Sequence, residues 1–154
     1  MDSAVVVHRG RHDQDMPAPH RPALSLVREG VAVNVEARWR REVGRFGEEL
    51  AVRHLRGCGY SVLDRNWRCR EGELDIVARL GECLVFCEVK TRSGERFGAP
   101  VDAVGPDKAR RLRRLACRWL GEKRPAYTEV RFDVISVWQS APGTARIEHL
   151  QGAF

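Results

Sequence analysis

Residues 72–92, which read GELDIVARLGECLVFCEVKTR, decide the fold of this chain. Residues 73–79 largely alternate in polarity, and an unbroken apolar run occupies residues 83–87. Alternation is typical of a strand with one buried face, and a short apolar run between turns is typical of a strand inside a sheet. Since residues 80–82 suit a tight connection, the segment predicts two antiparallel strands, over residues 73–79 and 83–91.

The flanking sequence predicts further helices and strands around this pair. A stripe of apolar residues indicates a helix over about residues 39–56, which Gly57 and Gly59 end. Pro106 suits the first turn of a second helix, which continues to about Leu120. We expect a polar turn over residues 66–72, a loop over residues 93–105, and further strands over residues 60–63, 129–138 and 145–150. The order α-β-β-β-α-β predicts a mixed α/β sandwich.

The first 36 residues differ from the rest of the chain. They contain Pro17, Pro19 and Pro22, show no steady period, and hold four Arg against five acidic residues. We therefore expect residues 1–36 to be a disordered extension and residues 37–154 to be the folded domain. The domain holds 23 basic and 16 acidic residues, which predicts an anionic partner, with nucleic acid first; basicity for solubility alone is the alternative.

Composition excludes several classes of protein. The 154 residues suit one domain, and no apolar run approaches the roughly 20 residues of a transmembrane helix, so we expect no membrane partner. The charged N-terminus does not have the layout of a signal peptide. The five cysteines include no C-x-x-C pair, which argues against a disulfide framework or a structural zinc site and fits a reducing cytoplasm.

Charged side chains in the two central strands form the candidate catalytic centre. Alternation places Glu73 and Asp75 on one face of the first strand, with Leu74 and Ile76 on the other. Glu88 and Lys90 likewise share a face of the second strand, and antiparallel pairing about residue 81 brings Asp75 close to Glu88. Two such carboxylates repel unless a proton or a cation lies between them, and Mg²⁺ takes carboxylate oxygens as ligands. Lys90 is placed to orient or deprotonate a metal-bound water, or to neutralise charge on a phosphate.

The alternative is a salt-bridge cluster on a solvent-facing edge, in which Lys90 pairs with Asp75 or Glu88. The apolar run before Glu88 favours a central strand, and a second acidic pair stands in the preceding strand. The chain also uses 24 Arg and only three Lys, so a lysine at position 90 suggests a preference for an ammonium. These three observations favour the catalytic interpretation.

The same residues resemble the PD-(D/E)XK nuclease fold, with Asp75 as its acidic residue and Glu88-Val89-Lys90 as its E-x-K. More closely, the chain resembles the small bacterial YraN family of uncharacterised proteins, which are similar to Holliday-junction resolvases. The resemblance spans about residues 40–138. It rests on GRFGE (44–48), GY (59–60), RNWR (65–68), GELDIV (72–77), FCEVKTR (86–92), FG (97–98), Lys108 and RFDV (131–134).

The resemblance implies a restriction-endonuclease-like sandwich and a Mg²⁺- or Mn²⁺-dependent deoxyribonuclease. It implies branched or otherwise structured DNA as the partner and leaves a homodimer open. It also implies that Glu48, on the first helix, joins Asp75 and Glu88 as a metal ligand and catalytic residue, beside Lys90. A helical wheel agrees, because Glu48 lies next to the apolar stripe, whereas Glu49 lies on the solvated flank.

Other roles stay open for several of these residues. Glu48 has an alternative as a boundary residue paired with Arg45 or Arg53. Asp133 is expected to support the sheet or to pair with an Arg, with a ligand role as the alternative. For the whole chain, the second hypothesis is a non-catalytic nucleic-acid-binding or partner-binding protein on the same fold.

Candidate DNA contacts surround the central strands and line the outer face of the second helix. A charged outer face is also what solvation alone requires, so these contacts remain an expectation. Trp67 is placed either to stack on an unpaired base or to be buried at the edge between helix and sheet. The loop over residues 93–100 suits a flexible segment that closes on DNA. The candidate contacts are Arg65, Arg68, Arg92, Lys108, Arg110, Arg113 and Arg114.

Overall fold

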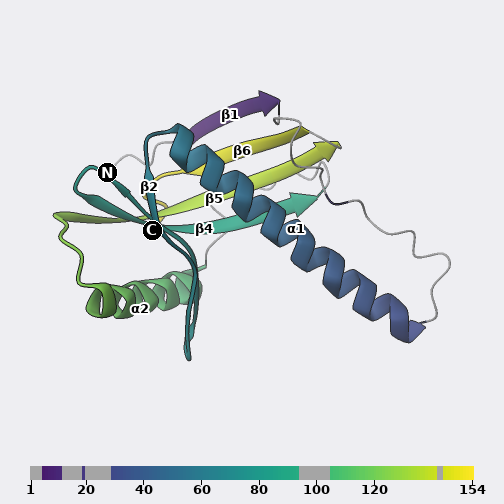
Figure 1. Ribbon diagram of the computed structural model, residues 1–154, viewed down its shortest axis with the longest axis horizontal. Coiled ribbons are helices and arrows are strands. Elements are labelled where there is room, and N and C mark those ends of the chain that lie inside the picture. Colours follow the sequence, from purple (N-terminus) through teal and green to yellow (C-terminus); the bar gives the residue numbers. More distant parts are fainter. Residues whose placement is uncertain (1–4, 12–18, 20–28, 94–104, 142–143) are drawn as a thin grey trace.

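A six-stranded sheet flanked by two helices forms the described part of this computed structural model (Figure 1). The structure describes residues 5–11, 19, 29–93, 105–141 and 144–154. Its elements are β1 (Val5–Arg11), α1 (Glu29–Gly57), β2 (Ser61–Cys69), β3 (Gly72–Leu80), β4 (Cys83–Ser93), α2 (Pro106–Lys123), β5 (Glu129–Ala141) and β6 (Thr144–Leu150).

The strands lie in the order β1-β6-β5-β4-β3-β2. Only β4 and β5 are parallel among these neighbours, and α2 lies between them in the sequence, because a parallel pair needs a long crossover connection. The predicted hairpin is confirmed, with Ile76 opposite Cys87 and Leu80 opposite Cys83. The predicted mixed α/β sandwich is also confirmed, and it is compatible with a restriction-endonuclease-like fold.

The two helices cover opposite faces of the sheet. Val85 and Cys87 of β4 point toward α1, whereas Leu84 and Phe86 point toward α2, as the period of a strand requires. Burial of each large apolar side chain contributes roughly 1.5–3 kcal/mol, so these two clusters hold the layers together. The α1 side of the core includes Leu50, Val52, Leu55, Ile76 and Ile135, and the α2 side includes Leu112, Leu115, Trp119, Leu74 and Val77.

The prediction of a polar turn over residues 66–72 is wrong. β2 continues through Cys69, so that only residues 70–71 separate it from β3. β2 is an edge strand with a register shift between Val62 and Asp64 and a positive φ of 51° at Asn66. Its polar residues therefore reflect an exposed sheet edge and not a loop, because edge strands are commonly charged and irregular.

Two segments of the expected N-terminal extension are elements of the fold. β1 pairs with β6, from Val5 opposite Leu150 to Arg11 opposite Thr144, and α1 begins at Glu29 instead of near residue 39. The backbone groups of β6 thus bond to those of β1 in the structure. Residues 1–4, 12–18 and 20–28 lie outside the described residues, as does the loop from residue 94 to residue 104.

Neither helix in the described ranges is long and apolar enough to cross a bilayer. All five cysteines are described, and all are free thiols.

Candidate active site

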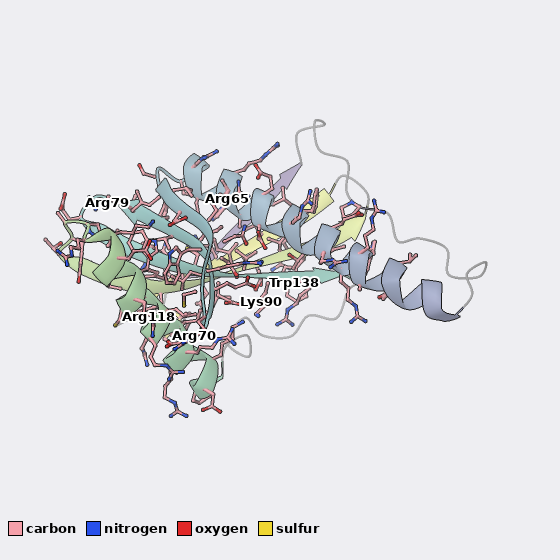
Figure 2. The ribbon with its side chains drawn as sticks, turned by 60° about the horizontal axis from the view of Figure 1, so that its bottom comes forward. Arg65, Arg70, Arg79, Lys90, Arg118 and Trp138 are labelled. Carbon is pink, nitrogen blue, oxygen red and sulfur yellow. The ribbon has the colours of Figure 1, made fainter. Side chains whose placement is uncertain are left out.

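A cleft of about 710 Å³ opens where α1, β3, β4 and α2 meet. Figure 2 labels Lys90, which lies on β4 in its wall. The charged residues in its lining are Glu36, Arg40, Glu48, Glu73, Asp75, Glu88, Lys90 and Lys108. The structure thus places all four predicted catalytic residues in one cleft, together with Lys108.

A glycine lets α1 approach the sheet beside this cleft. A Cβ atom added to Gly47 would lie 1.8 Å from Oγ1 and 2.9 Å from Cβ of Thr91 on β4. No other residue leaves room for this approach, because real Cβ atoms do not come so close to other atoms. Gly47 therefore positions Glu48, the next residue, against the strand that carries Glu88 and Lys90.

β3 changes its facing at Asp75. Leu74 packs with the α2 cluster and Ile76 with the α1 cluster, so the prediction that both share a face is wrong. The pairing of β3 with β4 ends at Ile76 and Cys87, and beyond it the Asp75 carboxylate Oδ2 accepts a hydrogen bond of 2.8 Å from the Val89 N–H. The break in alternation coincides with the point where the Asp75 side chain, and not the β3 backbone, bonds to the Val89 N–H of β4.

The surroundings of Asp75 oppose its ionisation. Burial and the nearby carboxylates of Glu88 and Glu48 raise the pKa of Asp75 to about 6. The hydrogen bond from the Val89 N–H and the charge of Lys108 act in the opposite direction and lower the pKa. Because like charges disfavour each other's ionised form, these carboxylates make a region of surplus negative charge. A bound cation or a proton would relieve that surplus.

Glu88 is ion-paired with two lysines. Its side chain is 8% exposed, and its Oε1 lies 2.7 Å from Lys90 Nζ and also contacts Lys108 Nζ. Burial by itself lowers the pKa of Lys90, but the hydrogen bond and charge of Glu88 outweigh it, so the pKa of Lys90 is raised. Burial lowers the pKa of Lys108, and the neighbouring Lys90 adds to this effect. The pairing of Lys90 with Glu88 is the contact that the salt-bridge alternative expected.

Lys108 has a different place from the one expected for it. The sequence predicts that Lys108 contacts DNA, whereas the structure places it inside the cleft on the buried Glu88. A signal for this was present, because Lys108 is one of only three lysines in the chain.

Glu48 bonds to β2 across the cleft wall. Its Oε2 accepts a hydrogen bond of 2.9 Å from Asn66 Nδ2, and Asn66 has a positive φ of 51°. The expected alternative partners, Arg45 and Arg53, are not bonded to Glu48 in the described structure. Arg53 pairs with Glu49 instead, at 3.8 Å. Sequence reasoning did not single out Asn66 for the site, although it lies in the quoted RNWR motif.

The donor chemistry of the cleft suits a hard cation. Among the described residues, no three His, Cys, Asp or Glu side chains are arranged to hold a metal ion together. Mg²⁺, however, is commonly held by one or two carboxylates and several waters. Asp75 and Glu88 supply two such carboxylates, and the raised pKa of Asp75 marks the charge that a cation would neutralise. The carboxylates of Asp75 and Glu88 therefore fit a hard cation, which would compete with the ammonium groups of Lys90 and Lys108 for Glu88.

A family model described as "Uncharacterised protein family UPF0102" matches residues 47–137. The chain belongs to the UPF0102 family. A UPF0102 protein of Frankia casuarinae is 59% identical over 112 residues, which cover 73% of this chain and 95% of the relative. Another UPF0102 protein, of Frankia alni, is 62% identical over 112 residues, which cover 73% of this chain and 93% of the relative. A third UPF0102 protein, of Acidothermus cellulolyticus, is 51% identical over 125 residues, which cover 75% of this chain and 95% of the relative.

Membership of UPF0102 confirms the resemblance to the YraN family. The names of these relatives state no activity, so the family assignment by itself carries none to this chain. The matched residues include those that form the cleft between α1 and α2, namely Glu48, Asp75, Glu88, Lys90 and Lys108.

The predicted DNA contacts of this UPF0102 protein are spread over several surfaces. Arg65 pairs with Glu49 at 3.0 Å, and Arg68 pairs with Glu73 at 2.9 Å. Trp67 packs on the α2 cluster and donates to Glu122 Oε2 over 3.2 Å, which corresponds to the buried alternative. The remaining arginines of the set are also placed: Arg92 lies over the Trp138 ring, Arg110 pairs with Asp107, Arg113 lies over the Phe154 ring, and Arg114 is exposed.

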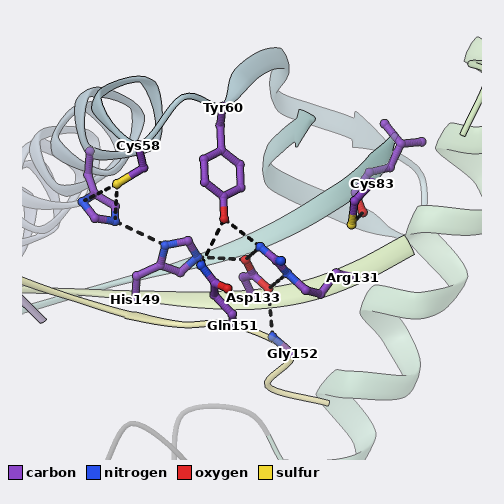
Figure 3. A network of polar contacts seen from close by, with 10 residues as sticks. Cys58, Tyr60, Cys83, Arg131, Asp133, His149, Gln151 and Gly152 are labelled. Atoms are coloured by element: carbon purple, nitrogen blue, oxygen red, sulfur yellow. Dashed lines mark hydrogen bonds and ion pairs between the residues drawn. The ribbon is translucent and has the colours of Figure 1, made fainter. Parts of the chain in front are cut away.

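Asp133 lies in a separate buried network (Figure 3). Arg131 donates to both of its oxygens over 2.9 Å, His149 Nε2 lies 2.8 Å from Oδ2, and the Gly152 N–H donates over 3.0 Å to Oδ1. Burial alone would raise the pKa of Asp133, but the hydrogen bonds from His149, Arg131 and Gly152 outweigh it and lower the pKa. The expected pairing with an arginine is confirmed, and Asp133 joins β5 to β6 and the C-terminal residues.

Proposed function

We propose that this UPF0102 protein is a metal-dependent, structure-selective DNA endonuclease that hydrolyses phosphodiester bonds. The observation that carries the proposal is the convergence of Glu48, Asp75 and Glu88 with Lys90 in one open cleft. Carboxylates with surplus negative charge and an adjacent ammonium are the groups that metal-assisted phosphodiester hydrolysis requires. Branched or otherwise structured DNA is the proposed substrate, following the resemblance to resolvases.

In this proposal, Asp75 and Glu88 hold the metal, and Glu48 stands beside them as the third carboxylate. A bound Mg²⁺ or Mn²⁺ would supply an activated water and a positive charge for the phosphate oxygen. Lys90 orients Glu88 through its ion pair and presents a positive charge to the phosphate entering the cleft. Asn66 fixes the orientation of the Glu48 carboxylate through its hydrogen bond.

A cytoplasmic location is part of the same proposal. All five cysteines are free thiols, and Cys58 and Cys117 are exposed. Exposed thiols persist in a reducing compartment, which is also where the DNA is found.

The second candidate function is a non-catalytic nucleic-acid-binding protein on the same fold. The observation in its favour is the ion pairing of Glu88 with both Lys90 and Lys108, which already compensates this buried carboxylate without a metal. This candidate expects binding that does not depend on a divalent cation and does not lead to cleavage.

The deciding experiment is a cleavage assay on branched, flapped and linear DNA with Mg²⁺, with Mn²⁺ and with EDTA. We expect cleavage of at least one branched substrate with either metal and none in EDTA. Asp75→Asn should abolish cleavage and any thermal stabilisation by Mg²⁺, while it keeps DNA binding in EDTA. Lys90→Ala should keep the stabilisation by Mg²⁺ and lose turnover.

The matched control is Asp107→Asn, which removes an exposed carboxylate of α2 outside the cleft lining. It should cut like the wild type. A wild-type protein that binds DNA but cuts no substrate with either metal would favour the non-catalytic candidate.

A further inference from the structure

The basic residues of α2 divide between two flanks of the helix. At about 100° per residue, the buried Leu112, Leu115 and Trp119 form one stripe along α2. Arg113 lies on one side of this stripe, and three other arginines lie on the opposite side. We call that opposite side the hairpin-side flank, and its members are Arg111, Arg114 and Arg118.

Contacts show that this flank faces the end of the β2–β3 hairpin. Arg118 Nε donates to Glu71 Oε2 over 3.0 Å. A Cβ atom added to Gly72 would lie 3.7 Å from Arg111 Nε, so the Arg111 side chain passes beside the hairpin turn. Figure 2 shows Arg70 and Arg118 together where the end of the hairpin meets α2. Arg113 lies on the other side of the helix, where its guanidinium is 5.8 Å from the centre of the Phe154 ring.

The hairpin-side flank of α2 and the end of the β2–β3 hairpin form one surface, and the charges on this surface are not balanced. Glu71 neutralises Arg118, and Asp107 neutralises Arg110. Arg70, Arg111 and Arg114 are all exposed, and none of them has an ion pair with another described residue. Three uncompensated guanidiniums on one surface favour an anionic partner with regularly placed charges.

The surface continues into the cleft. Lys108 stands in the first turn of α2 and contacts Glu88, and Arg111 follows it by about one turn. A polyanion that has one phosphate in the cleft can therefore place its neighbouring phosphates along the hairpin-side flank.

We propose that Arg70, Arg111 and Arg114 bind the phosphate backbone of the DNA arm that leads away from the cleft. The direction of the arm rests on the proposed function, whereas the binding itself does not. Of the sequence-based set, the assignment keeps only Arg114, and it adds Arg70 and Arg111. The other α2 arginines of that set, Arg110 and Arg113, are left out. Guanidiniums that are not engaged by carboxylates form phosphate contacts without first losing an ion pair.

The test measures binding of the full chain to a short fluorescent DNA duplex in EDTA over a range of NaCl concentrations. Arg70→Gln, Arg111→Gln and Arg114→Gln should each weaken binding and reduce the slope of log K against log salt by about 0.9. Arg113→Gln is the matched control on the opposite flank and should leave the slope unchanged. Arg111→Lys keeps the charge and should keep the slope, with melting curves used to check that each variant is folded.

Several outcomes would overturn the assignment. The assignment would be wrong if the protein did not bind the duplex, or if the slopes of Arg70→Gln, Arg111→Gln and Arg114→Gln were unchanged. It would also be wrong if Arg113→Gln had an equal effect, or if a folded Arg111→Lys variant lost slope. Tight binding of polyglutamate without binding of DNA would assign the surface to an acidic protein instead. Cleavage does not enter this measurement, so a protein with the expected slopes and no nuclease activity would refute the proposed function alone.

Discussion

Asp133 on β5 and Asp75 on β3 are acidic residues of the same sheet in opposite electrostatic surroundings. Asp133 is fully buried and is bonded to Arg131, His149 and the Gly152 N–H, which lower its pKa despite its burial. Asp75 is partly buried and accepts a hydrogen bond from the Val89 N–H. Burial and the carboxylates of Glu88 and Glu48 raise its pKa to about 6.

The charge of Asp133 therefore stabilises the fold, whereas the charge of Asp75 costs stability. A buried carboxylate surrounded by donors stabilises its neighbourhood, and its removal leaves those donors without a partner. A carboxylate placed near other carboxylates costs stability and is ready to bind a cation, an arrangement that is typical of functional sites.

Asp133→Asn should produce the largest loss of stability. The substitution leaves Arg131 and His149 without their carboxylate, and an uncompensated buried charge costs roughly 3–5 kcal/mol. Urea denaturation at neutral pH measures the change in the free energy of unfolding. Because the folded pKa of Asp133 lies below its unfolded value, the wild type should lose this stabilisation as the pH falls through the acid range.

The control for Asp133 is Asp107→Asn. Asp107 forms an ion pair with Arg110, and its side chain is 93% exposed, so its removal should change stability by less than about 0.5 kcal/mol. Similar effects of the two substitutions would contradict a structural role for the Asp133 network.

Glu88→Gln should destabilise the protein by about 2–3 kcal/mol, less than removal of Asp133. It leaves Lys90 and Lys108 close to each other without a counter-charge, but their side chains remain 31% and 28% exposed, and solvent screens part of the cost. A second substitution, Lys108→Met, should recover part of the loss in a double-mutant cycle. Glu73→Gln serves as the control, since the pair of Glu73 with Arg68 is exposed; an equal loss there would refute the argument.

Gly47→Ala tests how α1 is held beside the site. The added methyl group would overlap the Thr91 side chain, and overpacking costs about 1–3 kcal/mol, which exceeds the gain in helix propensity. Gly44→Ala, one turn earlier, meets no atom within 4 Å and should stabilise the helix by up to about 1 kcal/mol. Thermal melting of both variants gives the comparison, and a stabilised Gly47→Ala variant would show that α1 is not in close contact with β4.

Asp75→Asn should have the smallest effect on stability and the opposite sign. The folded pKa of about 6 exceeds the unfolded value of 3.8, so the folded state binds the extra proton between these values and wild-type stability falls as the pH rises through this range. The asparagine side chain does not titrate, so the variant should be equal to the wild type near pH 4 and more stable by about 1–2 kcal/mol above pH 6. Unfolding curves across this pH range measure the difference. A variant that is less stable at neutral pH would mean that the hydrogen bond to Val89 outweighs the repulsion.

The strands and helices that position the site could be predicted because their signals are local. The period of residues 73–79 and the apolar run at residues 83–87 identified the hairpin that brings Asp75 and Glu88 together. The apolar stripe of α1 also placed Glu48 beside the core. The start of α1 and the strand β1 could not be predicted, because their partners are distant in sequence and their own patterns are weak.

By itself, the sequence determined the mixed α/β architecture, the central hairpin, the cleft residues Asp75, Glu88 and Lys90, and membership of UPF0102. All of these depend on short-range periodicity or on contiguous motifs. Tertiary structure alone decided that β3 changes its facing at Asp75, that Asn66 bonds to Glu48, and that Lys108 shares Glu88 with Lys90. It also decided which arginines of α2 face the hairpin. Each of these features depends on the distance and orientation between elements far apart in the chain, which the pattern within any one element does not contain.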